Sequence, residues 1–294
     1  MLLPILSGVR VVHYPNPNDV TTLAKLIGTW RVSILLGTPT FVSNIMRAAG
    51  NADMSAVRLC VTGAEKCPAA VYDLLRTHCE KADILEGYGI TECSPFVSVV
   101  RQENPMPGTI GRALPSVKCQ IVDIESDQPC PPGSTGMLLV RGPSIFPGYL
   151  NYQGASPFVQ WNDETWYKTG DLVAMDAQGN MTFMGRLKRF VKIGGEMVSL
   201  PAIEEVLTAR FPSAADTGPG IAVLPTPDED HPELVLFTTQ QIDRAAANEA
   251  IRQAGLSGLH NVRMIRQISA MPLLGTGKTD YRALAELLKT NGPE

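Results

Sequence analysis

The stretch VRLCVTGAEKCPAAVYDLLRTHCEKADILEGYG, residues 57–89, decides the fold. It reads as an apolar strand at 57–63, a helix at 68–81 and a second strand at 82–89. Strands that alternate with helices in this way form parallel sheets, because a crossover connection returns the chain to the edge where it started. The stretch therefore predicts one strand–helix–strand unit of an α/β domain.

The same alternation precedes this unit. We expect a buried strand at 9–14 (VRVVHY), a helix at about 20–29, a strand at 32–37 and a helix at about 40–49. The chain thus opens on the closing strand and helix of a crossover unit, without a sheet neighbour of its own before them. We therefore expect the later part of a longer α/β domain, with an exposed edge and an apolar face in residues 1–60.

The pattern changes after Pro105. Short strands divided by Pro- and Gly-rich turns predict a β-rich section that ends at about Met184. From Leu200 the order is helix, strand, strand, helix, strand, helix, which predicts a small α+β domain. We therefore divide the chain into a parallel α/β part at 1–115, a β-rich subdomain at 116–184 and a small C-terminal domain at 185–294.

Composition excludes several classes of function. The net charge of -4 over 294 residues gives no basic excess that would attract nucleic acid. No apolar run reaches the ~20 residues that cross a bilayer, so no transmembrane segment is expected. The 6 cysteines form no C-x-x-C pair and the 4 histidines lie far apart. A zinc site or disulfide framework is therefore not indicated, and reduced thiols in a cytoplasmic protein are expected.

Two glycine-rich segments look like phosphate-binding loops but fail the full patterns. In GTGKT, residues 275–279, the earlier glycine of a Walker loop is replaced by Pro272, and too little chain follows for a metal-binding strand. In GYGITE, residues 87–92, the third glycine of the dinucleotide fingerprint is replaced by Glu92. The structural alternatives are a turn into the last helix and a strand-to-loop turn with a core tyrosine.

The residues of GYGITE nevertheless suit a nucleotide. Tyr88 offers an aromatic stacking face, and Gly89 allows close approach of the backbone. Thr91 offers a donor to phosphate and Glu92 a hard metal ligand. In WYKTGDL, Asp171 follows a glycine where a carboxylate can accept both ribose hydroxyls, although a simple turn aspartate is the alternative.

The segment GRLKRFVKIGGEMVSL, residues 185–200, gathers basic side chains among strand-forming residues. One interpretation is a solvated edge strand whose charges oppose aggregation. The other is a hinge followed by a catalytic face. The basic residues are Arg186, Lys188, Arg189 and Lys192.

Six motifs, in this order, resemble those of the adenylate-forming superfamily of AMP-binding enzymes, which includes acyl-CoA synthetases, firefly luciferase and peptide-synthetase adenylation domains. They are VTGAEKCP, GYGITECSP, PGTIGR, YKTGDL, GRLKRFVKIGGEMVSL and PLLGTGKTDY. Within it, LEGYGITECSP, KRFVKIGGEMVSL, LVLFTT and PLLGTGK are most similar to the acyl-acyl carrier protein synthetase region of bacterial 2-acylglycerophosphoethanolamine acyltransferases, enzymes of phospholipid metabolism.

The resemblance covers the whole chain but only the later part of the family's fold. The family's Thr/Ser/Gly-rich loop ending in Pro-Lys-Gly, which grips the ATP phosphates, would precede residue 1. GSTG, residues 133–136, is not this loop, because a strand follows it directly. We therefore expect weak or no activity from this chain alone. The alternative is a non-catalytic AMP-binding or assembly subunit that self-associates or needs a partner supplying the missing N-terminal half.

The resemblance implies an AMP-forming acid–thiol ligase that uses ATP and Mg²⁺. In such enzymes a fatty acid carboxylate attacks the α-phosphate of ATP to give an acyl-adenylate and pyrophosphate. The thiol of CoA or of an acyl carrier protein then displaces AMP, and the sequence leaves this acceptor open. A cytoplasmic location follows, with any association with the inner membrane made through the full-length protein.

Motif positions assign roles to residues of the large domain. The adenine would be lined by Gly63, Ala64, Glu65, Gly87, Tyr88 and Gly89, with the ring of Tyr88 stacked on the base. Thr91 would hydrogen-bond the α-phosphate, and Glu92 would bind Mg²⁺. Asp171 would hold the ribose hydroxyls, and Arg186 would support the ribose or a phosphate.

The same comparison implies roles for the small domain. Lys278 would bridge the carboxylate and the α-phosphate as a point charge on a long stem. Lys188 lies at the family's hinge position. After adenylation the domain would turn, withdrawing Lys278 and presenting the face around Lys192 and Gly194 for the thiol step.

Overall fold

The computed structural model describes residues 4, 6–212, 219–228, 231–274 and 278–290. The chain forms two compact units, Met1–Met184 and Gly185–Glu294. Among the described residues, no helix is long and apolar enough to cross a membrane.

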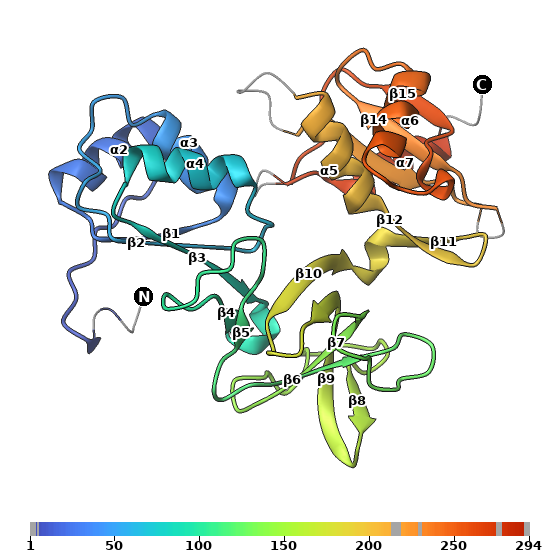
Figure 1. The fold of residues 1–294 in the computed structure, drawn as a ribbon, viewed down its shortest axis with the longest axis horizontal. Coiled ribbons are helices and arrows are strands. Elements are labelled where there is room, and N and C mark those ends of the chain that lie inside the picture. Colours follow the sequence, from blue (N-terminus) through green and yellow to red (C-terminus); the bar gives the residue numbers. More distant parts are fainter. Residues whose placement is uncertain (1–3, 5, 213–218, 229–230, 275–277, 291–294) are drawn as a thin grey trace. The chain divides into compact units, whose positions relative to one another are not determined.

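The first unit begins with a sheet in the order β1-β2-β3-β4-β5. Its first three strands are parallel and the last two are antiparallel. Helices α2, α3 and α4 lie together on one face of the sheet (Figure 1), and this confirms the α/β fold. The strands are β1 (Ile34–Gly37), β2 (Leu59–Gly63), β3 (Asp83–Gly89), β4 (Phe96–Val99) and β5 (Arg112–Ala113), and the helices are α2 (Val20–Thr29), α3 (Pro39–Arg47) and α4 (Ala69–His78).

Local signals explain where these helices begin. The carboxylate of Asp19 accepts a hydrogen bond from the amide of Thr22 and so caps α2. The hydroxyl of Thr38 caps α3 in the same way, and Pro39 occupies the first turn, where its missing N–H costs nothing. Each cap satisfies an amide that the helix itself leaves without a partner.

The two faces of β1–β3 differ. The helix-covered face buries Leu35 and Cys60 against the helices. The opposite face carries apolar side chains that are half-buried or exposed, with Ile34 at 48% and Leu36 at 63% exposure. A parallel sheet normally has both faces covered. We call this second face the open apolar face; its residues are Ile34, Leu36, Leu59, Val61 and Leu85.

The predicted strand at residues 9–14 is wrong. This segment has no regular structure and most of its residues are exposed. Its apolar pattern suits a strand, but a strand also needs a neighbour that pairs with its amides and carbonyls. Among the described residues, β1 forms that edge of the sheet and pairs only with β2.

A second, antiparallel sheet completes the first unit, in the order β10-β9-β7-β6 with β8 paired to β9. The amide of Ile110 donates to the carbonyl of Met181 at 2.8 Å, and the amide of Met181 donates to the carbonyl of Gly111 at 2.9 Å. These bonds tie the first sheet to the second. The strands are β6 (Lys118–Val122), β7 (Thr135–Arg141), β8 (Phe158–Trp161), β9 (Glu164–Met175) and β10 (Met181–Arg186).

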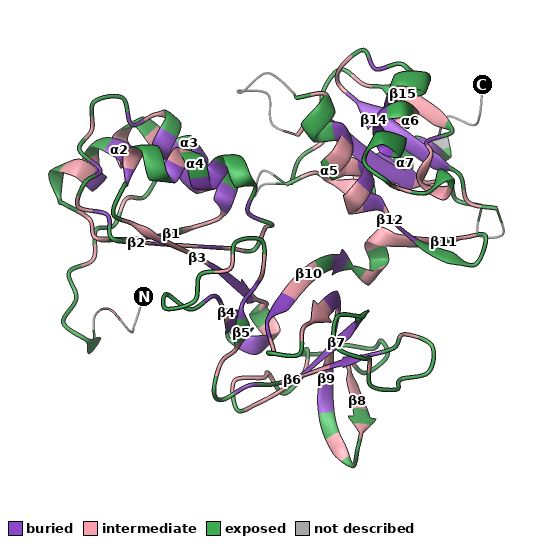
Figure 2. Ribbon diagram, viewed as in Figure 1, coloured by how far each residue is buried: buried purple, intermediate pink, exposed green. Residues whose placement is uncertain are grey.

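The second unit contains a hairpin, β11–β12, and a sheet in the order β13-β14-β15. Helices α5 and α6 pack on one face of this sheet and α7 on the other, so β14 is buried along its length (Figure 2). The elements are β11 (Phe190–Ile193), β12 (Glu196–Ser199), α5 (Leu200–Arg210), β13 (Ile221–Pro225), β14 (Leu234–Thr238), α6 (Arg244–Gln253), β15 (Met264–Gln267) and α7 (Tyr281–Thr290).

Gly111 and Gly108 provide a matched test of the junction between the sheets. Both have positive φ, +71° and +81°, but a Cβ on Gly111 would lie 2.1 Å from the backbone of Val99, whereas one on Gly108 would meet nothing within 4 Å. We expect Gly111→Ala to lower the free energy of unfolding by about 2–5 kcal/mol, and Gly108→Ala by only the conformational strain of about 1–2 kcal/mol.

Urea unfolding followed by tryptophan fluorescence measures this difference, because all 3 tryptophans, Trp30, Trp161 and Trp166, belong to the first unit. Equal losses for the two variants would contradict a tight approach at Gly111.

Candidate functional site

The ends of β2 and β3 lie side by side, with Gly63 paired to Gly87. A Cβ on Gly63 would lie 2.7 Å from the carbonyl oxygen of Gly87, and one on Gly89 would lie 2.2 Å from that of Pro95. These glycines are therefore required by close packing of the backbone. Ala64 turns the chain away from β2 with φ at +66°, and the carboxylate of the next residue, Glu65, accepts a hydrogen bond of 2.7 Å from Thr40.

Tyr88 and Asp171 meet although they are separated by 83 positions in the chain. The Tyr88 hydroxyl donates to Oδ2 of Asp171, on β9, at 2.5 Å. Asp171 is fully buried and Tyr88 is 8% exposed. The ring of Tyr88 also packs against Phe183, with centroids 6.0 Å apart. The two motifs GYGITE and YKTGDL thus form one site at the junction of the two sheets.

Thr91 and Glu92 follow β3 in the short 3₁₀ helix η1 (Thr91–Cys93). Thr91 is exposed and Glu92 is half-buried. Oε1 of Glu92 accepts a hydrogen bond of 2.6 Å from the hydroxyl of Tyr149, and its carbonyl accepts one of 2.8 Å from the amide of Phe146. The bond to Glu92 raises the pKa of Tyr149. Tyr149 was not identified from the sequence, where only its position in the Pro-Gly-Tyr turn marks it.

Glu86, immediately before the glycine of β3, is a second residue that the sequence did not reveal. Its carboxylate is 5% exposed. It accepts hydrogen bonds from the hydroxyl of Tyr72, on α4, and from the amide of Gly108, the latter at 2.8 Å. Burial raises the pKa of Tyr72, and the bond to Glu86 adds to this. Glu86 therefore fixes the PGTIGR loop against the strand that carries Tyr88.

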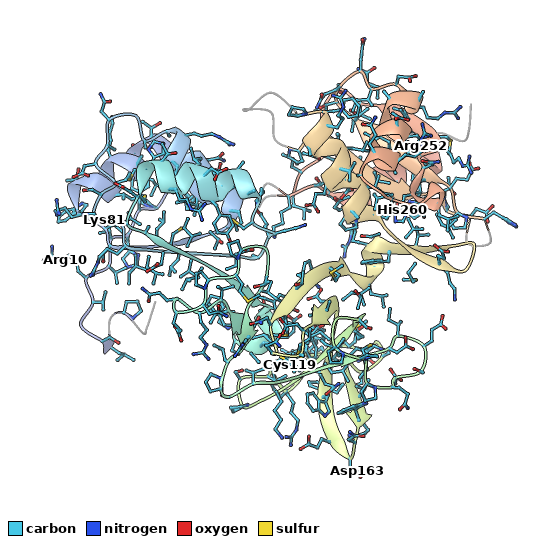
Figure 3. The ribbon with its side chains drawn as sticks, in the orientation of Figure 1. Arg10, Lys81, Cys119, Asp163, Arg252 and His260 are labelled. Atoms are coloured by element: carbon cyan, nitrogen blue, oxygen red, sulfur yellow. The ribbon has the colours of Figure 1, made fainter. Side chains whose placement is uncertain are left out.

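Burial makes the thiols of Cys93 and Cys119 poor nucleophiles. Cys93 lies next to Glu92, but burial raises its pKa to about 12, and the nearby charges of Glu92 and Asp171 add to this. Cys119, among the strands of the second sheet (Figure 3), has its pKa raised to about 12 by burial. A thiol of this pKa is protonated at neutral pH and unreactive. Within the described ranges, all 6 cysteines are free.

The basic residues at the end of β10 and immediately after it lie in the second unit. Arg186 and Lys188, on either side of Leu187, are exposed, and Lys188 belongs to the 3₁₀ helix η2 (Leu187–Arg189). Lys192 is exposed on β11, opposite Met197 of β12. Gly194 and the next glycine form the two-residue turn of this hairpin with φ at +58° and +87°, the left-handed conformation that such turns need.

Lys278 lies where backbone hydrogen bonds join residues 272–274 to residues 278–280, an arrangement that we call the clasp. Its carbonyl accepts a hydrogen bond of 2.8 Å from the amide of Leu274, and the amide of Asp280 donates to the carbonyl of Pro272 at 2.8 Å. The predicted glycine turn, residues 275–277, lies outside the described residues. The side chain of Lys278 is exposed, and α7 begins three residues later.

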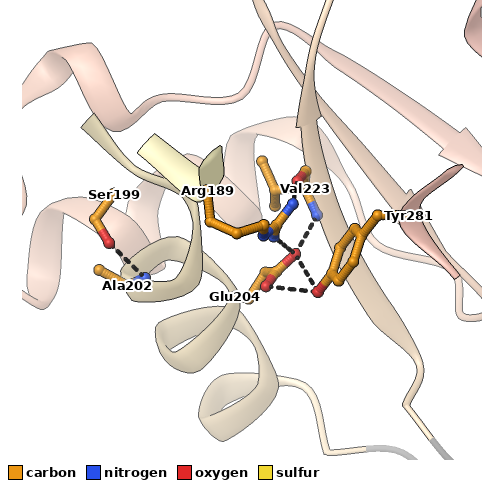
Figure 4. Close-up of polar contacts among 6 residues, drawn as sticks. All are labelled: Arg189, Ser199, Ala202, Glu204, Val223 and Tyr281. Atoms are coloured by element: carbon orange, nitrogen blue, oxygen red, sulfur yellow. Dashed lines mark hydrogen bonds and ion pairs between the residues drawn. The ribbon is translucent and has the colours of Figure 1, made fainter. Parts of the chain in front are cut away.

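Arg189 differs from its basic neighbours because its guanidinium is inside the second unit (Figure 4). Its Nη2 pairs with Oε1 of Glu204 at 2.6 Å, and the two side chains are 17% and 15% exposed. Arg189 also lies over the ring of Tyr281, 3.7 Å from the centroid. The interpretation of a uniformly solvated basic segment is therefore wrong at this position.

A scan against protein-family models matches residues 1–150 to the family "AMP-binding enzyme". Curated relatives include a 4-coumarate–CoA ligase of Pinus taeda, 30% identical over 74% of this chain and 40% of its own length. A long-chain-fatty-acid–CoA ligase of Escherichia coli is 27% identical over 97% of this chain and 50% of its own length. The chain thus spans about half the length of the curated relatives it matches.

Solved structures give the same fold. The O-succinylbenzoate coenzyme A synthetase of Bacillus subtilis, solved with ATP and magnesium ion, has a TM-score of 0.79 at 20% identity and covers 98% of this chain and 57% of that one. An anthranilate CoA ligase solved with anthranoyl-AMP has a TM-score of 0.75 at 24% identity, covering 97% and 56%. Because the family model spans 150 of the 294 residues, this chain belongs to the AMP-binding enzyme family.

Proposed function

We propose that this chain carries the nucleotide-binding and lysine-bearing part of an enzyme that activates a carboxylic acid with ATP and transfers the acyl group to a thiol. The observation that supports this most directly is the 2.5 Å hydrogen bond between Tyr88 and Asp171. It joins an aromatic residue and a buried carboxylate beside the carboxyl ends of parallel strands, where α/β sheets bind their ligands.

The nucleotide would lie across the ends of β2 and β3. Gly63, Ala64, Glu65, Gly87, Tyr88 and Gly89 would surround the adenine, and Asp171 would accept from the ribose hydroxyls. Thr91, exposed at the start of η1, would donate to the α-phosphate. Arg186 would support the ribose or a phosphate.

The donor set at Glu92 fits a magnesium ion bound with phosphates. Mg²⁺ in such sites usually takes one or two carboxylates together with phosphate oxygens and waters. No cluster of three or more acidic, His or Cys side chains is found within the described residues, and Glu92 is the protein ligand we propose. The ion would supply positive charge to the phosphates, and Tyr149 would hold Glu92 in place through its hydroxyl.

The second unit would supply two lysines for the two half-reactions. Lys278 would neutralise charge as the carboxylate attacks the α-phosphate, and Lys192 would serve the thiol step on the β11–β12 face. Lys188, in η2 next to the boundary between the units, would be the hinge.

The acid and the thiol acceptor are the finer parts of the proposal. The acid would be a fatty acid, as the name of the Escherichia coli relative, a long-chain-fatty-acid–CoA ligase, suggests. The relatives described above are CoA ligases, which favours CoA, whereas the resemblance of KRFVKIGGEMVSL favours an acyl carrier protein. An acidic carrier protein and the phosphates of CoA would both be attracted to the exposed Arg186, Lys188 and Lys192.

The ribose contact can be tested by binding. We expect the wild-type chain to bind AMP about 10- to 100-fold more tightly than 2′,3′-dideoxyadenosine monophosphate, because a charged acceptor strengthens a hydrogen bond by about 1.5–3 kcal/mol. Asp171→Asn keeps an acceptor for Tyr88 but removes the charge, and should reduce this preference to about 3-fold or less. Isothermal titration calorimetry measures it.

Tyr88→Phe is the matched control, because it leaves the carboxylate in place and should retain the preference for AMP. Equal affinity of the wild-type chain for the two nucleotides would sink the assignment of Asp171 to the ribose.

The division of labour between the lysines can be tested in an enzyme that also carries the phosphate-gripping loop. Lys278→Ala should slow acyl-dependent ATP–pyrophosphate exchange about 10²–10³-fold, because it removes a charge that stabilises the transition state. It should spare thioester formation from a supplied acyl-adenylate. Equal slowing of both half-reactions would argue against this division, and exchange by the present chain alone would contradict the expected need for that loop.

The open apolar face favours a second candidate, an assembly subunit. Its Leu36 is 63% exposed on a sheet face that α/β proteins normally cover, and a second copy of the chain is the occupant we propose. Leu36→Glu should leave the fold intact and shift the chain toward monomer in sedimentation velocity at micromolar concentration. A wild-type chain that is monomeric under these conditions would remove the basis of this candidate.

A further inference from the structure

A partly buried network in the second unit has no part in the proposed chemistry. Arg189 donates from Nη2 to Glu204 at 2.6 Å and from Nη1 to the carbonyl of Val223 at 3.2 Å, while its guanidinium covers the ring of Tyr281 (Figure 4). Glu204 also accepts from the amide of Val223 at 2.7 Å and from the hydroxyl of Tyr281 at 3.0 Å. The network therefore joins η2, α5, β13 and the start of α7.

The charges within it depend on each other. Burial raises the pKa of Glu204, and the positive charge of Arg189 acts in the opposite direction. Without Arg189, the carboxylate would keep two neutral donors but lose its only ion pair among the described residues. A buried charge that loses its partner destabilises a protein more than a pair replaced by neutral groups of similar size.

The network lies next to both lysine-bearing segments. Arg189 directly follows Lys188 and directly precedes β11, the strand that carries Lys192. Tyr281 is the first residue of α7 and comes three residues after Lys278.

Backbone bonds link Tyr281 to Lys278. The carboxylate of Asp280 accepts from the amide of Arg282 at 3.0 Å and caps α7. The amide of Asp280 donates to the carbonyl of Pro272, and the amide of Leu274 donates to the carbonyl of Lys278. Lys278 and Asp280 are thus both bonded to residues 272–274, and Asp280 directly precedes Tyr281.

We propose that Arg189 is a positioning residue that fixes the segments of Lys192 and Lys278 together on the body formed by α5 and β13. Its planar guanidinium makes an ion pair, a carbonyl contact and an aromatic contact at once, which the single ammonium of a lysine cannot do. The proposal rests on the roles proposed for the two lysines, but the geometry it describes can be measured without activity.

Hydrogen exchange of single amides in the intact chain tests the positioning. We compare Arg189→Met with Arg189→Met/Glu204→Gln, in which no buried charge is left unpaired. In the double variant, the free energy of unfolding of the second unit should return close to the wild-type value. The amides of Leu274 and Asp280 should still exchange about 10- to 100-fold faster than in wild type, because the clasp they form opens locally. Amides of β14 serve as the internal reference.

Arg210→Met is the matched control. Arg210 also lies over an aromatic ring, that of Phe211 at 5.4 Å. It is exposed and, within the described residues, makes no hydrogen bond to either lysine-bearing segment. It should leave the exchange of Leu274 and Asp280 unchanged. Wild-type exchange of these amides in the double variant, or an increase shared equally by β14, would overturn the positioning role.

A kinetic arm separates this inference from the proposed function. In the complete enzyme, Arg189→Lys should lower kcat of both half-reactions about 10-fold and leave AMP affinity unchanged, because Asp171 belongs to the other unit. If Lys278→Ala had no effect on adenylation, the proposed function would fail while the exchange result would stand. If Arg189→Lys altered only KM or left both rates at wild-type values, the positioning role would fail instead.

Discussion

Burial of carboxylates against tyrosine hydroxyls is the constraint on which the rest of this structure depends. Asp171 and Glu86 are buried and Glu204 is partly buried, and each accepts a hydrogen bond from a tyrosine: Tyr88, Tyr72 and Tyr281. Taking a carboxylate out of water is costly unless its oxygens are satisfied. Each pair therefore holds two elements together, across 14 positions of the chain for Tyr72 and Glu86 and across 83 and 77 positions for the other two pairs.

The three pairs serve different segments. Tyr88 and Asp171 join the two sheets of the first unit, and Glu86 holds the PGTIGR loop through the amide of Gly108. Glu204 holds Arg189, the last residue of η2, and Tyr281, the first residue of α7. The carboxylates thus lie where loops that carry candidate site residues must be held in position. The apolar clusters between the sheets and helices supply the remaining stability.

The sequence predicts elements well where the signal is local. The helix expected at 20–29 is α2, because Asp19 marks its start by capping, and glycines mark the ends of β2 and β3. It fails at 9–14, where the apolar pattern is present but no strand of the described part of the chain lies beside it to pair with. The motifs locate Tyr88, Glu92 and Asp171, yet they do not reveal Tyr72 or Tyr149, because a hydroxyl's partner is decided by tertiary contacts that no spacing rule encodes.

Arg189 shows that the sequence also does not reveal which basic side chains are exposed. In the sequence it is one of four basic residues in GRLKRFVK, and each looks equally available to an acidic partner. In the structure the guanidinium of Arg189 neutralises Glu204 within the unit, while Arg186, Lys188 and Lys192 remain exposed on either side. The segment therefore has one basic residue, Arg189, bonded inside the unit, and exposed basic residues before and after it. This arrangement would suit the hinge proposed at Lys188, because residues that turn would then be attached to a body that does not deform as they move.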